Sequence, residues 1–273
     1  MATPTGPFKV LSARYKYDAL DPSNQNIDVL YPDTTGQLFP LIAYAHGFSD
    51  DGGDKWYEDL GPELASWGYV VAFPNSCTYG CFHDCKSLPK DPPCYGHYYL
   101  QQLLTVQWAS SPAASELPIN TSVVAVAGHS MGGQASLFSA ANATEVARLG
   151  IKAAVFHHAY THTYPPAVVP FLAFTGTADH TAPPYMAQNI FDAEGACAVR
   201  GLVNKMGADH HEPSTHYNQQ LATFTIAWIK LYVDQTPQSL GRDWQELVYG
   251  NSTASLCGGG DGEMAQCSIL PAS

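Results

Sequence analysis

The sequence predicts an α/β fold in which a mostly parallel central sheet carries helices on both faces. Strand-like segments alternate with helix-like segments along most of the chain, the pattern of parallel strands joined by crossover helices. Several strand-like segments, such as residues 38–45, are unbroken apolar runs, which is typical of strands buried on both faces. The 273 residues are enough for one such domain, and no linker divides them.

The chain is expected to open with a pair of strands, followed by alternating strands and helices. Residues 9–17 and 26–31 are strand-like and flank a turn rich in Asp, Pro, Ser and Asn. Two apolar runs then predict buried strands on either side of a helix at residues 56–67. The strands beyond the first pair are expected at residues 38–45, 69–73, 123–127, 153–156, 171–175 and 199–204. The further helices are expected at residues 98–109, 131–141, 185–193 and 217–233.

Charge and hydropathy exclude two classes of partner. Twenty-four acidic residues against twelve Lys and Arg give a formal charge of −12, which repels nucleic acid and anionic membranes. No apolar stretch approaches the roughly 20 residues that a membrane-spanning helix needs. Residues 1–7 lack the charged start and apolar run of a signal peptide.

The cysteines and glycosylation sequons predict an extracellular protein. Clustered cysteines in irregular segments are typical of disulfides, and their spacing here matches no common zinc pattern. We expect disulfides among Cys77, Cys81, Cys85, Cys94, Cys257 and Cys267. Cys197 is then left as a buried free thiol. Asn-x-Ser/Thr sequons at Asn120, Asn142 and Asn251 are compatible with a secreted glycoprotein.

The strongest local signal is the segment Gly128-His129-Ser130-Met131-Gly132. It lies between an expected strand and an Ala-rich expected helix, the context that a G-x-S-x-G nucleophile motif requires. The glycines allow a sharp turn, with Ser130 in strained backbone geometry. The backbone N–H of Met131, at the helix start, would face the oxyanion of a tetrahedral intermediate.

A serine nucleophile needs a base and an orienting carboxylate, which follow it in the chain order Ser, Asp, His. Asp179 lies just after the expected strand at residues 171–175, on the same sheet edge as Ser130. The loop after residues 199–204 supplies the base, but two adjacent histidines, His210 and His211, compete there. Position alone does not separate them.

Phe48 and a group of histidines are further candidates near this edge. Phe48 follows the apolar run 38–45, and its N–H would be the second oxyanion donor. His157, His158 and His162 are clustered in sequence. A metal site there is conceivable, but such histidines more often line a polar pocket, and we expect no metal.

At these residues the sequence resembles the bacterial cutinases and poly(ethylene terephthalate) hydrolases, α/β-hydrolases related to dienelactone hydrolases and chlorophyllases. The likeness runs from about Phe39 to the C-terminus. It is carried by Leu64-Ala65-Ser66-Trp67-Gly68-Tyr69-Val70-Val71, by Gly128-His129-Ser130-Met131-Gly132-Gly133, by Thr177-Ala178-Asp179-His180-Thr181-Ala182-Pro183 and by Gly207-Ala208-Asp209-His210-His211-Glu212-Pro213.

The resemblance implies roles that the residues alone leave open. The family's Gly-Ala-Ser-His-Phe-Ala-Pro loop places the catalytic histidine at His210 and an aromatic where His211 stands. Tyr160 occupies the position of the family's substrate-stacking Trp, and Phe48 that of its aromatic oxyanion residue. Cys257 and Cys267 resemble its C-terminal disulfide. A shallow cleft without a lid domain and the absence of a cofactor are also implied.

The chain departs from that family in the segment before Phe48 and in a long loop. His46 replaces the usual proline, as in the chlorophyllase and dienelactone-hydrolase branch, and the cysteine-rich loop at about residues 75–97 is absent from the bacterial enzymes. Polyester activity therefore does not follow directly.

We expect a single-domain, monomeric serine esterase that forms an acyl-enzyme. Ser130, His210 and Asp179 are its catalytic residues, and Phe48, His129, Tyr160 and His211 contact the ester. Its substrate is a polyester or, alternatively, a chlorophyll-type or small ester. Acyl transfer to an acceptor other than water, or a catalytically idle binding protein, are the remaining alternatives.

Overall fold

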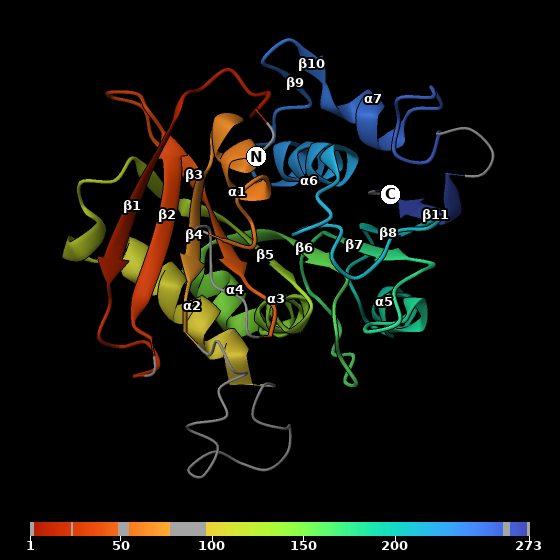
Figure 1. The fold of residues 1–273 in the computed structure, drawn as a ribbon, viewed down its shortest axis with the longest axis horizontal. Helices are drawn as coiled ribbons and strands as arrows, with labels where there is room; N and C mark the ends of the chain where they lie inside the picture. The colour runs from red at the N-terminus through yellow and green to blue at the C-terminus, as the bar shows by residue number, and fades with distance from the viewer. Residues whose placement is uncertain (1–2, 23, 49–54, 77–96, 259–262, 272–273) are drawn as a thin grey trace.

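A nine-stranded sheet runs through the middle of the computed structural model, which describes residues 3–22, 24–48, 55–76, 97–258 and 263–271 (Figure 1). The spatial order is β1-β2-β4-β3-β5-β6-β7-β8-β11. The strands from β4 to β8 in this spatial order, β3 included, pair in parallel. Strands β1, β2 and β11 add antiparallel edges. The strands are β1 Val10–Lys16, β2 Asn26–Pro32, β3 Phe39–Ala45, β4 Val70–Pro74, β5 Ile119–His129, β6 Ile151–His157, β7 Phe171–Gly176, β8 Arg200–Lys205 and β11 Met264–Leu270.

Helices cover both faces of the sheet, which confirms the predicted fold class. Alternate residues of β3 show how the two layers form. Leu41 and Ala43 belong to the apolar core under α2, α3 and α5, while Ile42 and Tyr44 belong to the core under α1, α6 and α7. These helices are α1 Leu60–Ser66, α2 Tyr98–Ala109, α3 Met131–Ala141, α5 Pro184–Phe191, α6 Gln219–Tyr232 and α7 Trp244–Tyr249. The described elements form no separate lid domain.

All eight expected strands and five expected helices are present, with bounds that differ by a few residues. Helix α1 begins four residues later than expected, and β5 extends from Ile119 to His129. The sequence reading missed the elements α4 Ala143–Leu149, η3 Pro112–Ala114, β9 Gln238–Ser239, β10 Arg242–Asp243, α7 and β11. Strand β11 is a half-exposed edge strand with mixed polarity, so it has no apolar run to announce it.

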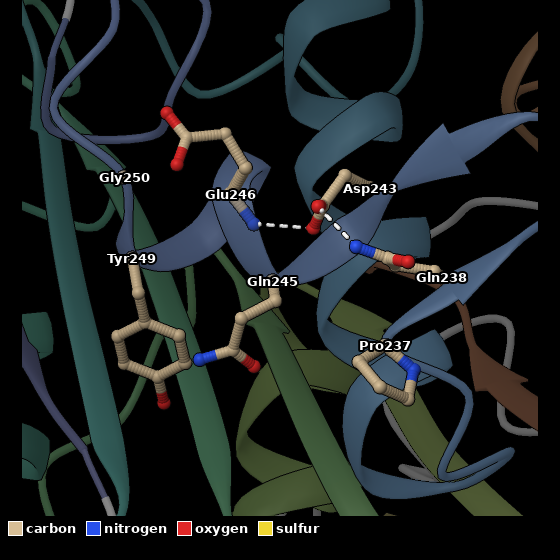
Figure 2. A pocket seen from close by; sticks show the side chains of 7 residues that line it. All are labelled: Pro237, Gln238, Asp243, Gln245, Glu246, Tyr249 and Gly250. Atoms are coloured by element: carbon tan, nitrogen blue, oxygen red, sulfur yellow. Dashed lines mark hydrogen bonds between the residues drawn. The ribbon is translucent and has the colours of Figure 1, made fainter.

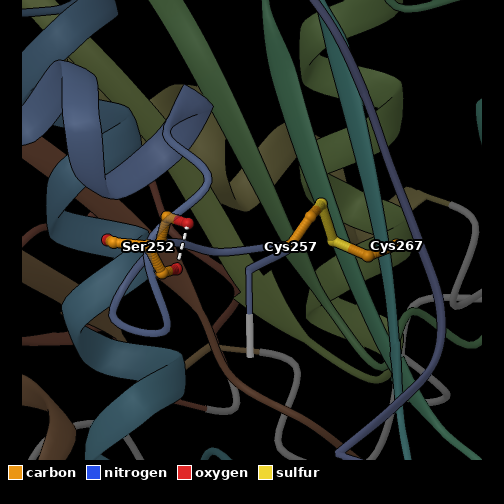
Figure 3. Close-up of a disulfide and its surroundings, with 4 residues drawn as sticks. Ser252, Cys257 and Cys267 are labelled. Atoms are coloured by element: carbon orange, nitrogen blue, oxygen red, sulfur yellow. Dashed lines mark hydrogen bonds between the residues drawn. A yellow bond between two sulfur atoms is a disulfide. The ribbon is translucent and has the colours of Figure 1, made fainter. Parts of the chain in front are cut away.

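A disulfide between Cys257 and Cys267 joins the C-terminal loop to β11 (Figure 3), as the resemblance implies. Cys197 has a free thiol and is only partly buried, where full burial was expected. The disulfides expected at Cys77, Cys81, Cys85 and Cys94 lie outside the described residues. Among the helices described here, none combines the length and the apolar character required to cross a bilayer.

Candidate active site

Ser130 lies at the sharp turn between β5 and α3. Its φ of 57° and ψ of −120° are unusual for a residue with a side chain. Its N–H donates to the carbonyl of His157 at 3.0 Å, and its own carbonyl accepts from the N–H of Tyr160 at 2.9 Å. These bonds to the end of β6 and the following loop hold the strained turn in place.

Gly132, two residues after Ser130, is required by a close approach of β3. A Cβ atom on Gly132 would lie 1.9 Å from the carbonyl oxygen of Ala45. This contact leaves no room for any side chain at position 132. It also explains why Ser130 lies beside the end of β3, from which the segment with Phe48 continues.

Three side chains that are far apart in sequence form one hydrogen-bonded chain. The Oγ of Ser130 lies 2.9 Å from Nε2 of His210. The Nδ1 of His210 lies 2.9 Å from Oδ2 of Asp179. All three residues are buried. The structure thus places His210, and not His211, between the serine and the carboxylate.

Asp179 is held as a carboxylate by donors on both of its oxygens. Its Oδ1 accepts from the N–H groups of Thr181 at 2.9 Å and Ala182 at 2.7 Å. Its Oδ2 accepts from His210 and from His158 at 2.8 Å. Burial alone would raise the pKa of Asp179, but the hydrogen bonds from these partners outweigh it and hold the pKa well below its usual range.

His129 holds the loop that carries His210, a contact that was not expected from the sequence. It is buried, and its Nε2 lies 2.7 Å from the carbonyl oxygen of His210. Its Nδ1 lies 2.9 Å from the hydroxyl of Tyr57, which accepts from the N–H of Gly47 at 2.9 Å. One tautomer satisfies both of these contacts, with Nε2 donating and Nδ1 accepting.

The two expected oxyanion donors lie at the ends of neighbouring elements. Met131 is the first residue of α3, and the first N–H groups of a helix have no acceptor within it. Phe48 lies three residues after β3, the strand that pairs with β5. Its side chain is 50% exposed, so its ring lies at the surface.

The residues expected on the substrate side are more exposed than the triad. Tyr160 is half-buried and its hydroxyl lies 3.3 Å from Nε2 of His162. His211 is exposed, and its ring centroid lies 5.8 Å from that of His210. Both are therefore available to a ligand at this rim.

The three histidines of the segment 157–162 do not gather into one site. His157 is buried between the hydroxyls of Tyr44 at 3.0 Å and Thr225 at 2.9 Å. Burial, followed by the nearby charges of His158 and His129, lowers the pKa of His157 well below its usual range. His162 is exposed. The His158 ring lies between Asp179 and Glu212 instead.

His158 was not assigned to the triad from the sequence. Its Nδ1 lies 2.8 Å from Oδ2 of Asp179, and its Nε2 lies 3.0 Å from Oε2 of Glu212. His158, Asp179 and His210 each place one possible ligand atom within 4.8 Å of the other two, close enough to share a metal ion. Both histidine nitrogens, however, face the same carboxylate oxygen at hydrogen-bond distance, so protons between these atoms account for the geometry.

A surface recess of about 510 Å³ lies in another part of the molecule (Figure 2). Its lining residues come from the segment of β9, β10 and α7, including Gln238, Asp243 and Tyr249. None of the triad side chains contributes to it. It is a feature of the C-terminal segment and not of the serine site.

Residues 1–240 match the model of a protein family described as PET hydrolase-like. The chain belongs to this family. It is also 25% identical over 211 residues to a bis(hydroxyethyl) terephthalate hydrolase of Streptomyces coelicolor. The match covers 76% of the chain and 61% of that relative, so the chain spans less than two thirds of its relative's length. The α/β architecture agrees with membership of the PET hydrolase-like family.

Proposed function

We propose that this chain hydrolyses carboxylic esters through an acyl-enzyme on Ser130. The observation that carries the proposal is the hydrogen-bonded chain from Ser130 Oγ through His210 to Asp179, with both links at 2.9 Å. Hydrogen-bond contact between a nucleophile and its base, with a third group orienting the base, is the arrangement that activates a hydroxyl. Membership of the PET hydrolase-like family supports the same chemistry.

The reaction proceeds in two halves. Ser130 Oγ attacks the ester carbonyl while His210 Nε2 takes the hydroxyl proton, and the carbonyl electrons move onto the oxyanion. Collapse of this intermediate breaks the ester C–O bond, and His210 protonates the departing alcohol. Water then attacks the acyl-serine with His210 again as base, which releases the acid and restores the Ser130 hydroxyl.

Asp179 and the backbone donors supply the electrostatics of both halves. The buried carboxylate accepts from His210 Nδ1, which fixes the tautomer and stabilises the imidazolium as it forms. The N–H groups of Met131 and Phe48 are proposed to hold the oxyanion. Loss of one such donor costs roughly 3 kcal/mol of transition-state stabilisation.

We propose terephthalate-type esters as the substrate class. The relative from Streptomyces coelicolor is a bis(hydroxyethyl) terephthalate hydrolase. Phe48 and Tyr160, exposed and half-exposed, are aromatic side chains suited to packing against an aromatic acyl group. A panel from p-nitrophenyl butyrate through bis(hydroxyethyl) terephthalate and triglyceride to a polyester film tests this choice. A preference for aliphatic acyl groups would contradict it.

Ser130→Ala tests the proposed nucleophile. The variant is expected to fold and to lose p-nitrophenyl butyrate turnover, because it lacks the attacking oxygen. Ser115→Ala, on an exposed turn, is the matched control and is expected to keep full turnover. Unchanged turnover in Ser130→Ala would contradict the role of Ser130 as the nucleophile.

We also propose that the protein is exported and acts as a monomer outside the cell. The Cys257–Cys267 disulfide and the sequons at Asn120, Asn142 and Asn251 support export, since disulfides persist in oxidising compartments. A mass shift of the protein from its natural source on treatment with an N-glycosidase tests the export, and sedimentation of the purified chain tests the monomer.

A further inference from the structure

His158 lies between two carboxylates in the interior of the site. The Nδ1 atom lies 2.8 Å from Asp179 Oδ2, and Nε2 lies 3.0 Å from Glu212 Oε2. The side chain of His158 is 0% exposed, as is that of Asp179, and that of Glu212 is 6% exposed. Both imidazole nitrogens are therefore committed to carboxylate oxygens in a place shielded from bulk water.

The backbone holds the ring in this position. His158 follows β6 and has a φ of 47°, a left-handed conformation that residues with a side chain adopt rarely. Its N–H donates to the carbonyl of Phe174 in β7 at 2.9 Å. Such strain persists where the surrounding structure imposes it, and it is concentrated at functional sites.

A count of protons decides the state of the ring. An ionised carboxylate only accepts hydrogen bonds, and a neutral imidazole has one donor and one acceptor nitrogen. With one proton, His158 would direct a lone pair at a carboxylate oxygen. With two protons, both contacts become charge-assisted hydrogen bonds, which are among the strongest in proteins.

We propose that His158 is an imidazolium clamped between Asp179 and Glu212, a positioning residue that extends the triad to a five-residue chain, Ser130–His210–Asp179–His158–Glu212. The cation fixes the Asp179 carboxylate from the side opposite His210, so that Oδ2 stays aligned with the base. The catalytic part of this proposal rests on the proposed esterase function, whereas the charge state of His158 does not.

The charged groups around the clamp balance one another. Glu212 accepts through Oε1 from the side-chain amide of Asn218, and Lys205 Nζ lies 3.6 Å from the same oxygen. The His210 ring lies 6.2 Å from that of His158, and the neighbouring His157 is kept neutral by its lowered pKa. Within the clamp itself, two carboxylates and one imidazolium leave one negative charge, the same as a lone Asp179, and Lys205 lies on the outer side of Glu212.

The titration behaviour agrees with the geometry. Burial alone lowers the pKa of His158, but its hydrogen bonds to Asp179 and Glu212 outweigh burial and raise the pKa above the usual value. Burial likewise opposes ionisation of Glu212, yet the bonds from His158 and Asn218 and the charge of Lys205 lower its pKa. The imidazolium of His158 stabilises the charged forms of both carboxylates, and each carboxylate stabilises the charged form of His158.

Nitrogen NMR of the full chain with ring-labelled histidine tests the charge state directly, and His158→Gln assigns the signals. Both ring nitrogens of His158 are expected to carry protons from about pH 5 to 8, where an ordinary histidine loses one. In Glu212→Gln, one nitrogen is expected to lose its proton within that range. An unprotonated nitrogen on His158 of the unaltered protein at neutral pH would overturn the proposal.

Kinetics test the positioning role. In His158→Gln two carboxylates remain without the cation, so the acidic limb of the kcat/KM profile is expected to move up by about one unit. The double variant His158→Gln/Glu212→Gln restores one negative charge, and its limb is expected to return toward the starting position. An acidic limb that does not move in His158→Gln, or that stays displaced in the double variant, would overturn the positioning role.

His180→Gln, an exposed histidine of the loop after Asp179, is the matched control and is expected to leave the profile unchanged. The esterase function and the charged state of His158 can be tested independently. Absent ester turnover with a doubly protonated His158 would contradict the esterase function alone. Normal turnover with a neutral His158 would contradict the clamp alone.

Discussion

The imidazole of His129 is hydrogen-bonded to the backbone of His210, with Nε2 at 2.7 Å from the carbonyl oxygen. His129 thus anchors the segment that carries His210. The other nitrogen of His129 reaches Tyr57, whose hydroxyl accepts from the N–H of Gly47. Together with Tyr57, His129 ties the end of β5 to the segments after β3 and β8.

His129→Phe is expected to lower both stability and activity. It removes the His129 contact of the buried carbonyl of His210 and one of the contacts of the Tyr57 hydroxyl, and a buried polar group left unsatisfied costs about 1–3 kcal/mol. The fall in kcat is expected to exceed the change in KM, because the base is displaced while the surface of the cleft is kept. Thermal unfolding and ester kinetics measure the two effects, with His180→Phe as the exposed control. Unaltered kcat would contradict the anchoring role.

Gly132→Ala is expected to disrupt the nucleophile turn. The added Cβ would lie 1.9 Å from the carbonyl oxygen of Ala45, so either β3 or the start of α3 must move. We expect a loss of more than about 3 kcal/mol of stability or failure to fold, the scale of severe overpacking. Gly241→Ala has a positive φ but no atom within 4 Å of its Cβ, and about 1 kcal/mol is expected there. Similar losses in the two variants, measured by urea unfolding, would contradict the steric explanation.

The ionisation of Asp179 is expected to contribute to stability above about pH 4, the usual range of an unfolded aspartate. Its pKa is depressed in the folded protein, so the folded state binds this proton less readily than the unfolded state. The contribution is therefore present above the unfolded pKa and is lost as the pH falls through the folded pKa. Asp179→Asn removes this contribution. The free energy of unfolding, measured from neutral pH downward, should fall less steeply below pH 4 in the variant, and equal slopes would contradict the assignment.

The Cys257–Cys267 disulfide is expected to stabilise the C-terminal edge without affecting catalysis. The two residues are separated by 10 positions, for which loop-closure entropy predicts about 2–3 kcal/mol. Strand β11, which carries Cys267, pairs with β8 on its outer side. Cys257→Ser/Cys267→Ser is expected to lower the unfolding temperature and to increase hydrogen exchange in β11, with kcat retained at ambient temperature. Loss of kcat in the folded variant would show that the edge strand supports the site.

The sequence predicts much of this site because its elements are locally encoded. The apolar runs of β3 and β7 and the Ala-rich segment of α3 are recognisable in the sequence alone, and Ser130 lies in a motif with a defined strand–turn–helix context. Asp179 and His210 follow from chain order together with the family resemblance. Strand β11 was missed because a half-exposed edge has neither an apolar run nor strict alternation.

The clamp around His158 depends on tertiary structure and has no local signal. His158, Asp179 and Glu212 come from the segments after β6, β7 and β8, which are neighbours only because the sheet places these strands side by side. The positive φ of His158 is uncommon for a residue with a side chain, so the sequence alone does not predict it. The contacts of His129 were missed because they too depend on tertiary structure, since its partner Tyr57 lies before α1.

Labelling with a fluorophosphonate, read by peptide mass spectrometry, tests whether His210 activates Ser130. We expect one adduct on the Ser130 side chain, no adduct in Ser130→Ala, and labelling slowed by at least about 100-fold in His210→Gln, the lower scale of general-base catalysis. Folded protein that leaves Ser130 unlabelled, or that labels equally fast without His210, would contradict the account.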